Sequence, residues 1–339
     1  MRVRTTALVA IIICTFAAPA IAYGPKGHQV IGAIADDQLT KSAKAAVAKN
    51  LGYPLRIAAN WADCVRDVEK SGSKFIYKPD PRYSGSCKVF ASAVGQDRMI
   101  SYARRNWDKC NDPEAAKGCH ALYHFADVPI QEDHYDRAFA GTSDHDVVSA
   151  INAAIAKLQG NAVPKPFSIK DKAEAILMLA HLVGDLHQPL HVGSIYLDVN
   201  DKPADPGPVT TPHDKTMDTR GGNWLEVGAS NLHSDWDGIA ASWDPMHLAK
   251  STTDAAKAVP ASPGSIEDWA ADWASETVKA SQDAYGELTF TRAGAAKPTD
   301  RVTTFPDRSA YLKSKALVQE TEMITAGARL AQILNAIWP

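Results

Sequence analysis

The segment HLVGDLHQPLHVG, residues 181–193, places three histidines and one aspartate among leucines and valines. It continues an apolar run, KAEAILMLA, that predicts a mostly buried helix ending near the proline of the segment. His181 and Asp185 are four residues apart and share one face of such a helix, whereas His187 points roughly to the other side. His191 follows the proline, where the chain is free to turn back. Ordinary hydrogen bonds could satisfy these buried groups, but the convergence of His181, Asp185 and His191 favours a divalent cation.

Other histidines and acids occur in similar contexts along the chain. His233 and Asp237, in NLHSDWDG, form a second pair at helical spacing. Single candidates are Asp63 in NWADCVR, His124 in ALYHFADVP and His28 in YGPKGHQV. Each of these residues alone is a weak signal, but together they form a strong candidate set to complete the metal site. The histidines that we expect on the solvated surface are His134, His145, His213 and His247, and His120 is left open.

The first 22 residues predict a secretory signal peptide, because a basic start precedes a short apolar stretch and the small-residue site Ala-Ile-Ala. Cleavage between Ala22 and Tyr23 would leave a domain of residues 23–339, which we expect to be secreted or periplasmic. The apolar stretch is too short for a comfortable membrane span, and no other segment suggests an anchor. We expect the mature chain to be a monomer.

Four cysteines remain after this cleavage: Cys64, Cys87, Cys110 and Cys119. An even number of cysteines in an exported protein predicts two disulfides, for which three pairings are possible. We favour Cys64–Cys87 and Cys110–Cys119, because each pair closes a short local loop. A zinc site made of these cysteines is the weaker alternative, since the chain has no C-x2-C pair among them.

The charge balance limits the ways in which this chain can bind a polyanion. The signal peptide carries two arginines and no acid, so its removal takes the formal net charge from −3 to −5. An acidic protein is poorly suited to holding a phosphate backbone through a lysine surface. Bound cations would have to supply the positive charge if the substrate is a phosphate ester.

Helical periodicity dominates the chain, and alternating strand patterns are scarce. No repeat or linker separates two cores, so we expect one all-α, mostly helical domain. The long segment Tyr196–Arg220 exceeds a simple connection and is expected to line a site. The predicted helices are His28–Leu39, Ser42–Leu51, Leu55–Val68, Gly95–Asn106, Asp144–Leu158, Ser168–Gln188, His233–Leu248, Ser265–Tyr285 and Asp307–Ile337.

The motifs YGPKGH, NWAD, YHFAD, HLVGDLHQPLH, RGGNW and NLHSDWD occur in this order between Tyr23 and Asp237. This series resembles the zinc-dependent type I nucleases, which include fungal single-strand-specific nucleases, plant bifunctional nucleases and bacterial relatives. The resemblance implies a single domain of the zinc phospholipase C and single-strand nuclease type, with three zinc ions at the bottom of a cleft. It also implies hydrolysis of single-stranded DNA and RNA to 5′-nucleotides, with 3′-nucleotidase activity.

The resemblance implies a ligand set position by position. Asp63, His124, His181 and Asp185 would hold one zinc. The amine and carbonyl of Tyr23, with His28 and a bridging Asp185, would hold the second. His191, His233 and Asp237 would hold the third, and His187 would hold none. Family members usually begin with Trp rather than Tyr, but the contacts expected at Tyr23 are main-chain atoms.

The chemistry implied by the resemblance gives further residues a role. Asp63 would orient a water shared by two metals, and Asp185 would bridge them. Phe125 would stack a base and Asp127 would accept hydrogen bonds from its edge, unless they are only a core residue and a turn residue. Asn223, in the GGN motif, would contact the phosphate.

Two other functions fit part of the pattern. A zinc-dependent phospholipase C has a similar fold and metal set, but it carries Glu in place of Asp237 and differs in the spacing after its first residue. A non-catalytic exported zinc-binding protein would need neither open coordination positions nor Phe125 beside a ligand. The nuclease is therefore the preferred interpretation.

Overall fold

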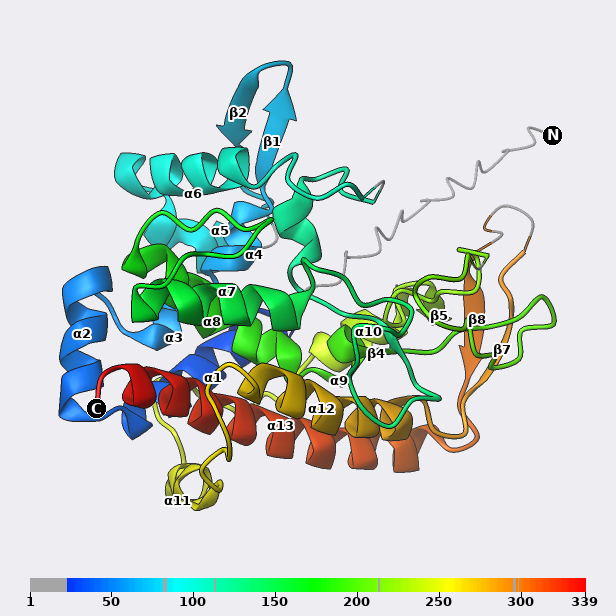
Figure 1. Ribbon diagram of the computed structural model, residues 1–339. Helices are drawn as coiled ribbons and strands as arrows, with labels where there is room; N and C mark the ends of the chain where they lie inside the picture. The colour runs from blue at the N-terminus through cyan, green and yellow to red at the C-terminus, as the bar shows by residue number, and fades with distance from the viewer. Residues whose placement is uncertain (1–22, 82–83, 113, 213, 295–296, 298) are drawn as a thin grey trace, which may run out of the picture.

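Helix α8 (Lys172–Leu186) lies at the centre of the structure, a computed structural model that describes residues 23–81, 84–112, 114–212, 214–294, 297 and 299–339. All residues of α8 after its first are buried. Helices α7, α13, α3 and α4 pack around it, and α13 also runs along α1 (Figure 1). The residues predicted to form a signal peptide lie outside the described part of the chain.

The mostly helical single domain expected from the sequence is confirmed. The long helices besides α8 are α1 (Pro25–Gln38), α2 (Lys41–Leu51), α6 (Ala93–Arg105), α7 (Val147–Gln159), α11 (Lys250–Ala258), α12 (Trp269–Tyr285) and α13 (Arg308–Ile337). Short helices and 3-10 turns are α3 (Leu55–Ala58), α4 (Trp61–Val65), α5 (Ser84–Cys87), η1 (Lys88–Phe90), η2 (Cys119–Leu122), α9 (Pro189–Val192) and α10 (Leu232–Asp237).

The strands are short; apart from one buried parallel pair, they lie at the edges of the helical body (Figure 1). They are β1 (Val68–Ser71), β2 (Lys74–Tyr77), β3 (Val128–Pro129), β4 (Gly193–Ser194), β5 (Leu225–Val227), β6 (Ser230–Asn231), β7 (Thr289–Arg292) and β8 (Arg301–Thr304). The antiparallel β1–β2 hairpin projects from the molecule, β3 and β4 pair in parallel, and the remaining strands form a sheet of order β6-β5-β8-β7.

Seven predicted helices occur at the expected places, as α1, α2, α6, α7, α8, α12 and α13, with ends that differ by no more than four residues. Helix α8 begins later than predicted, because the Asp171 side chain accepts a hydrogen bond from the Glu174 amide and so caps the helix there. Helix α11 was not anticipated from the sequence, since alanines are its only apolar residues.

The helix predicted over Leu55–Val68 is wrong, because the segment divides into α3 and α4 and then enters β1. The carbonyl of Ala59, at the division, accepts a hydrogen bond from the His181 ring at 2.6 Å. A tertiary partner therefore occupies a carbonyl that a continuous helix would use itself. The division leaves Asp63 in the short helix α4, close to α8.

The helix predicted over His233–Leu248 is also wrong, because α10 ends at Asp237 and Gly238 is extended. The carbonyls of Asp235 and Trp236 accept hydrogen bonds from Lys315 and Gln319 of α13. These side chains take the place of the next helical turn, so the end of α10 is set by packing against α13.

Both predicted disulfides are confirmed. Cys64–Cys87 ties α4 to α5, and Cys110–Cys119 closes a loop before η2. Cross-links of this kind persist in oxidising compartments, which agrees with the expected export. Among the described residues, no helix has the length and apolar character needed to cross a bilayer.

Two glycines allow α1 to lie very close to its neighbours. A Cβ at Gly32 would lie 2.6 Å from the Arg56 Cα, at the contact with α3. A Cβ at Gly327 of α13 would lie 2.5 Å from the Ile34 Cβ. Real Cβ atoms do not approach other atoms so closely, so these positions hold α1 and its His28 against the rest of the core.

We predict that Gly32→Ala and Gly327→Ala each lower the free energy of unfolding by roughly 1–3 kcal/mol, because the added methyl group overpacks a helix contact. Denaturant unfolding followed by circular dichroism would measure this. Gly85→Ala is the matched control, since its Cβ would meet nothing within 4 Å. Parent-like unfolding of both α1-contact variants would show that these contacts can relax.

Candidate metal centre

Three groups of buried or half-buried His and Asp side chains each bring their ligand-type atoms within 4.8 Å of one another. The first group is His28, His181 and Asp185, the second is Asp63, His124 and His181, and the third is His191, His233 and Asp237. These three groups contain every side chain that we expected from the sequence to bind a metal. Each group has the donor set that divalent transition metals prefer in proteins.

Asp185 lies between the first two groups and uses a different oxygen toward each. Its Oδ1 is 3.4 Å from His28 Nε2, whereas its Oδ2 is 2.8 Å from His124 Nδ1 and 3.2 Å from His181 Nε2. The i,i+4 spacing on α8 puts His181 and Asp185 on one face, as predicted. A carboxylate so placed is suited to contact two cations at once.

Backbone carbonyls orient three of the histidine rings. The Nδ1 atoms of His181, His191 and His233 lie 2.6–2.7 Å from the carbonyl oxygens of Ala59, His124 and Gly221, respectively. Such short contacts assign the ring proton to Nδ1 in the neutral form, and they leave Nε2 as an electron-pair donor. This is the arrangement found around histidines that bind metals.

The third group fits a cation because of how its two rings face each other. The Nε2 atoms of His191 and His233 are 3.0 Å apart, and each carries a lone pair when its Nδ1 holds the proton. Two buried lone pairs at this distance repel one another. A cation between them, with Asp237 beside it, would turn the repulsion into two coordinate bonds.

The first two groups contain buried polar atoms that make no hydrogen bond within the protein. Among the described residues, neither ring nitrogen of His28 has a hydrogen bond, and the same is true of Asp185 Oδ1 and Asp63 Oδ2. His28 and Asp185 are completely buried. Buried groups of this kind are costly unless something satisfies them, so the residues present fit bound metal ions.

Burial sets the protonation of most of these rings. It lowers the pKa of His28 and His124, and it lowers the pKa of His191 to about 3 and that of His233 to about 4. His181 differs: burial alone would lower its pKa, but the charges of Asp185 and Asp63 raise it to about 9. Most of the rings are therefore held in the neutral form that binds metals.

Close packing around two glycines supports the centre. A Cβ at Gly184 of α8 would lie 2.9 Å from His28 Nδ1, so only glycine lets α1 bring this ring beside Asp185. Gly221 has φ of +54°, and a Cβ there would lie 2.0 Å from the Leu190 carbonyl. This turn presents the carbonyl that orients His233.

Tyr23 and His187 form a buried contact behind the centre. The Tyr23 hydroxyl donates to the His187 carbonyl at 3.0 Å, and the Tyr23 carbonyl accepts from the His28 amide at 3.3 Å. The His187 ring contacts the Val183 carbonyl and the guanidinium of Arg329, so it points away from the three groups. Its exclusion from the predicted ligand set agrees with this orientation.

A cavity of about 360 Å³ opens onto the centre, and His124, His191 and His233 line it. Phe125, Asp127 and Asn223, the predicted substrate residues, line the same cavity. A second cavity of about 290 Å³ shares Phe125 and Asp127 with the first. Its other lining residues include Tyr196, Val209, Lys215 and Asp218, so the long segment 196–220 lines a cavity.

The predicted substrate residues differ in exposure, backbone conformation and hydrogen bonding. Phe125 is half-buried, whereas Asp127 is buried and adopts φ of +48°. Burial, together with the charges of Asp218 and Glu114, raises the pKa of Asp127 well above its usual value. A protonated carboxyl can donate as well as accept a hydrogen bond. The Asn223 side-chain amide donates one N–H to the Arg220 carbonyl at 2.8 Å, which leaves its second N–H for a substrate oxygen.

Several residues of the cavity were not identified from the sequence. They are Arg66, Glu114, Lys117, Arg220 and Trp224. Arg66 pairs with Asp63 at 3.4 Å, and its position three residues after Asp63 in a helical segment could have indicated it. Trp224 directly follows the GGN motif, but its role depends on where that turn lies in space.

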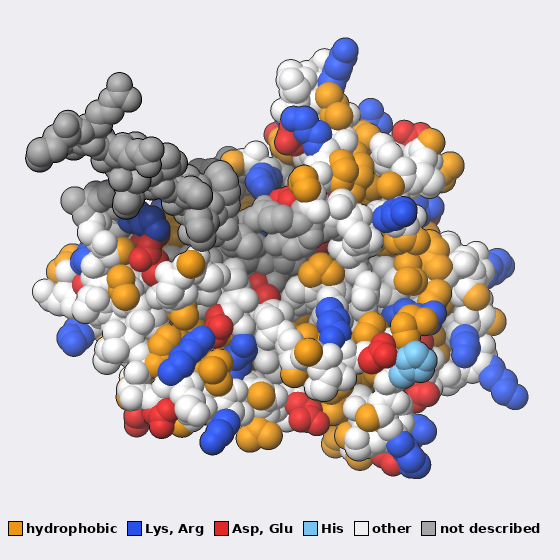
Figure 2. Space-filling view, turned by 180° about the vertical axis from the view of Figure 1, so that it is seen from behind, with side chains coloured by type: hydrophobic (Ala, Val, Ile, Leu, Met, Phe, Trp, Pro, Cys, Tyr) orange, Lys and Arg blue, Asp and Glu red, His pale blue; other side chains and the backbone are white. Residues whose placement is uncertain are grey.

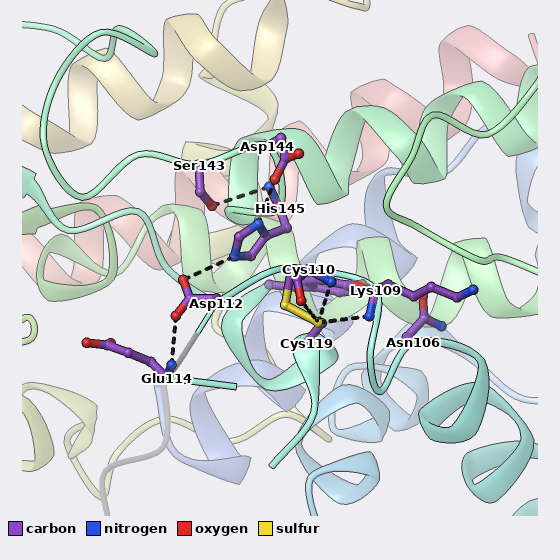
Figure 3. Close-up of a disulfide and its surroundings, with 10 residues drawn as sticks. Asn106, Lys109, Cys110, Asp112, Glu114, Cys119, Ser143, Asp144 and His145 are labelled. Atoms are coloured by element: carbon purple, nitrogen blue, oxygen red, sulfur yellow. Dashed lines mark hydrogen bonds and ion pairs between the residues drawn. A yellow bond between two sulfur atoms is a disulfide. The ribbon is translucent and has the colours of Figure 1, made fainter. Parts of the chain in front are cut away.

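One surface prediction is wrong. His145 is only 7 % exposed and lies between Asp144, at 2.7 Å, and Asp112, at 3.6 Å (Figure 3). Asp112 belongs to the loop that the Cys110–Cys119 disulfide closes, and this loop brings the acid over His145. His134 and His247 are exposed as predicted, His120 is buried, and His213 lies outside the described residues.

We predict that the metal-free protein loses stability as the pH falls from 6.5 to 4.5. Burial, with the Arg329 charge, lowers the pKa of His187 to about 3, so the folded protein keeps this ring neutral while the unfolded chain, near 6.5, takes up a proton. This difference is worth roughly 2–3 kcal/mol over two pH units. His181, with its raised pKa, acts in the opposite sense: its contribution is present below pH 6.5 and is lost as the pH rises through about 9.

Thermal unfolding in a chelator at pH 6.5, 5.5 and 4.5 would measure the effect. His187→Gln should flatten the fall of the midpoint, because it removes a ring that titrates only in the unfolded chain. His247→Gln, at an exposed position, should keep the slope of the parent. Identical slopes for all three proteins would contradict the prediction.

Comparison with known families gives one match. The family model described as S1/P1 Nuclease matches residues 23–339. The matched region therefore contains all three His and Asp groups and both cavities. No curated protein was found that matches the chain.

Proposed function

The chain belongs to the S1/P1 nuclease family, and we propose that it is an exported, zinc-dependent phosphodiesterase that cleaves single-stranded DNA and RNA to 5′-nucleotides and removes 3′-phosphates. Family membership indicates a nuclease whose substrate is nucleic acid. The observation that carries the finer proposal is the cavity in which three ligand-type histidines lie beside an aromatic ring and a buried carboxyl.

We assign the residues to three zinc ions as the geometry allows. Asp63, His124, His181 and Asp185 would hold one ion, and His191, His233 and Asp237 another. His28, Asp185 and the main chain of Tyr23 would hold the remaining ion. Asp185 could serve two ions, because one of its oxygens lies toward His28 and the other toward His124. The ion at Tyr23 needs a free α-amine, so a form that retains one residue before Tyr23 should contain fewer zinc ions by elemental analysis.

Bound zinc ions would supply Lewis acidity, which lowers the pKa of water and offsets the charge of a phosphate. The residues of the chain would then position the reactants. Asp63 uses Oδ1 toward Arg66, and its Oδ2 is left to orient an attacking water. The Arg66 guanidinium lines the cavity, where it can hold a phosphate oxygen. Asn223 can add a hydrogen bond through its amide.

Recognition of the substrate would depend on Phe125 and Asp127. An aromatic face can stack a base, and Asp127 lies beside it in both cavities. Stacking on Phe125 requires a base that is not already stacked in a duplex. This requirement favours single strands and loops over double-stranded nucleic acid.

The distribution of charge agrees with a phosphate substrate that is held locally. On the face shown in Figure 2, lysines and arginines are interspersed with acids rather than gathered into one area. Within the cavity, however, Arg66, Lys117 and Arg220 lie around the metal groups. The attraction for a phosphate would therefore be concentrated at the centre instead of being spread over the surface.

The two alternative functions are less well supported. An aromatic ring beside a carboxyl can also hold a choline head group, so the argument against a phospholipase C rests on Asp237 and on the short spacing between Tyr23 and His28. A zinc-storage protein has no use for a 360 Å³ cavity with cationic side chains around its metal groups. The same assay can separate all three functions.

We predict that the mature protein releases acid-soluble nucleotides from denatured DNA and releases no phosphorylcholine from phosphatidylcholine. A strong chelator should abolish the activity, and added zinc should restore it. Activity should also fall at low pH, because protons displace zinc from the histidines. Full nuclease activity in a preparation shown to be metal-free would refute the proposed site, and release of phosphorylcholine alone would favour the phospholipase.

We further predict that Phe125→Ala raises the KM for single-stranded DNA by roughly 5- to 150-fold, the contribution expected of one stacked base. Zinc content should remain that of the parent, since no ligand is removed. Asp127→Asn should change the preference among homopolymers more than the overall rate. Phe75→Ala, at a half-buried aromatic outside both cavities, is the matched control. Parent-like cleavage of all four homopolymers by both variants would make Phe125 and Asp127 structural residues.

A further inference from the structure

Part of the 360 Å³ cavity is formed by a stacked pair, Trp224 and Arg220. The guanidinium carbon of Arg220 lies 4.5 Å from the centre of the Trp224 ring system. Both side chains are half-buried, and Arg220 Nη2 forms an ion pair with Glu114 Oε1 at 2.8 Å. The indole and the guanidinium plane therefore form a flat, cationic surface on the cavity.

The backbone holds this pair in place. Arg220 adopts φ of +52°, which is unusual for a residue with a side chain, and its amide donates to Asp218 Oδ1 at 2.7 Å. The Trp224 amide donates to the Thr219 carbonyl at 3.1 Å, and the Trp224 carbonyl accepts from the Arg301 amide. A conformation of this kind persists only when its surroundings fix it, and it commonly occurs at binding sites.

The pair adjoins the position proposed for the first base: a Cβ at Gly221, the residue after Arg220, would lie 3.2 Å from Asp127 Oδ1. Phe125 and Asp127 line both cavities, whereas Trp224 and Arg220 line only the one that opens onto the metal groups. A base against Phe125 and Asp127 can extend toward Tyr196 and the second cavity. Such a base leaves the surface of Trp224 and Arg220 available for another group.

The chemistry of the pair indicates which group that is. Nucleobases stack on indole rings and on guanidinium planes. Lys117 and Arg220, on the same cavity, provide positive charge for a phosphate that follows the base. A flat cationic surface next to a phosphate-cleaving centre therefore fits a second nucleotide of a single strand.

We propose that Trp224, with Arg220 stacked on it, is a second base-binding platform that holds the nucleotide adjoining the one bound at Phe125. The proposal rests on the nuclease function proposed above. The ligand is a single-stranded dinucleotide or a longer strand, and a mononucleotide does not reach the platform. The platform thus selects polymers over single nucleotides.

The test compares two substrates with the zinc-loaded mature protein. One is a dinucleoside monophosphate, which offers a base on each side of the phosphate, and the other is a 3′-mononucleotide, which offers one base. Trp224→Ala should raise the KM for the dinucleotide by roughly 5- to 150-fold, with a smaller change in kcat. Its KM and kcat for the 3′-mononucleotide should remain within about twofold of the parent.

Three further variants separate binding from structure. Trp224→Phe should recover most of the dinucleotide KM, because it restores an aromatic face. Arg220→Lys should raise that KM, because it keeps the charge but loses the planar group. Lys70→Ala is the matched control: Lys70 also lies over a tryptophan, Trp107, and pairs with an acid, Asp108, but it lies outside both cavities. Zinc content and the thermal midpoint would be measured for each variant.

The outcomes separate this proposal from the proposed function. Cleavage of neither substrate by the parent would refute the nuclease function itself. Equal dinucleotide KM values for the parent and Trp224→Ala would overturn the platform alone. A matching loss on both substrates would also overturn it, since Trp224 would then serve the first base or the metal centre. If Trp224→Ala fails to fold, an unchanged dinucleotide KM for Arg220→Lys would overturn the platform.

Discussion

The structure depends on a centre of buried histidine and aspartate side chains whose lone pairs face one another. His191 and His233 direct their Nε2 atoms together at 3.0 Å, and Asp185 lies against His28, His124 and His181, all of them buried. Such a centre opposes folding unless cations occupy it, because unpaired buried polar groups are costly. Metal binding and the stability of this domain are therefore expected to be one thermodynamic event.

The rest of the fold keeps these atoms in place. Helix α8 carries His181 and Asp185 through the core, and glycines at positions 32, 184 and 327 let α1 and α13 pack closely enough to bring His28 to it. Main-chain carbonyls at Ala59, His124 and Gly221 orient the rings. Because each of these carbonyls is taken from a break or turn, the irregular parts of the chain are as necessary to the centre as the helices.

The cavity joins this centre to the residues that are proposed to bind the bases of the substrate. Phe125 and Asp127 lie next to the ligand His124 in sequence, while Trp224 and Arg220 come from the turn that orients His233. The residues proposed to bind bases are thus rigidly connected to the residues proposed to hold metals. A substrate bound by its bases would have its phosphate placed at the metal groups with little further movement, which is an advantage for catalysis by positioning.

The sequence by itself determined the helical class and the pairs His181–Asp185 and His233–Asp237, because helical spacing puts the members of each pair on one face. It favoured the two disulfide pairings without determining them, because each closes a short loop. It did not determine where helices break, since Ala59 and Asp235 give their carbonyls to His181 and Lys315, which are more than seventy residues away in sequence. The burial of His145 against Asp112 and the pairing of Arg220 with Glu114 were decided by tertiary structure for a similar reason. Asp112 and Glu114 reach these residues only because the disulfide-closed loop folds against distant turns, and no pattern within a local window records such contacts.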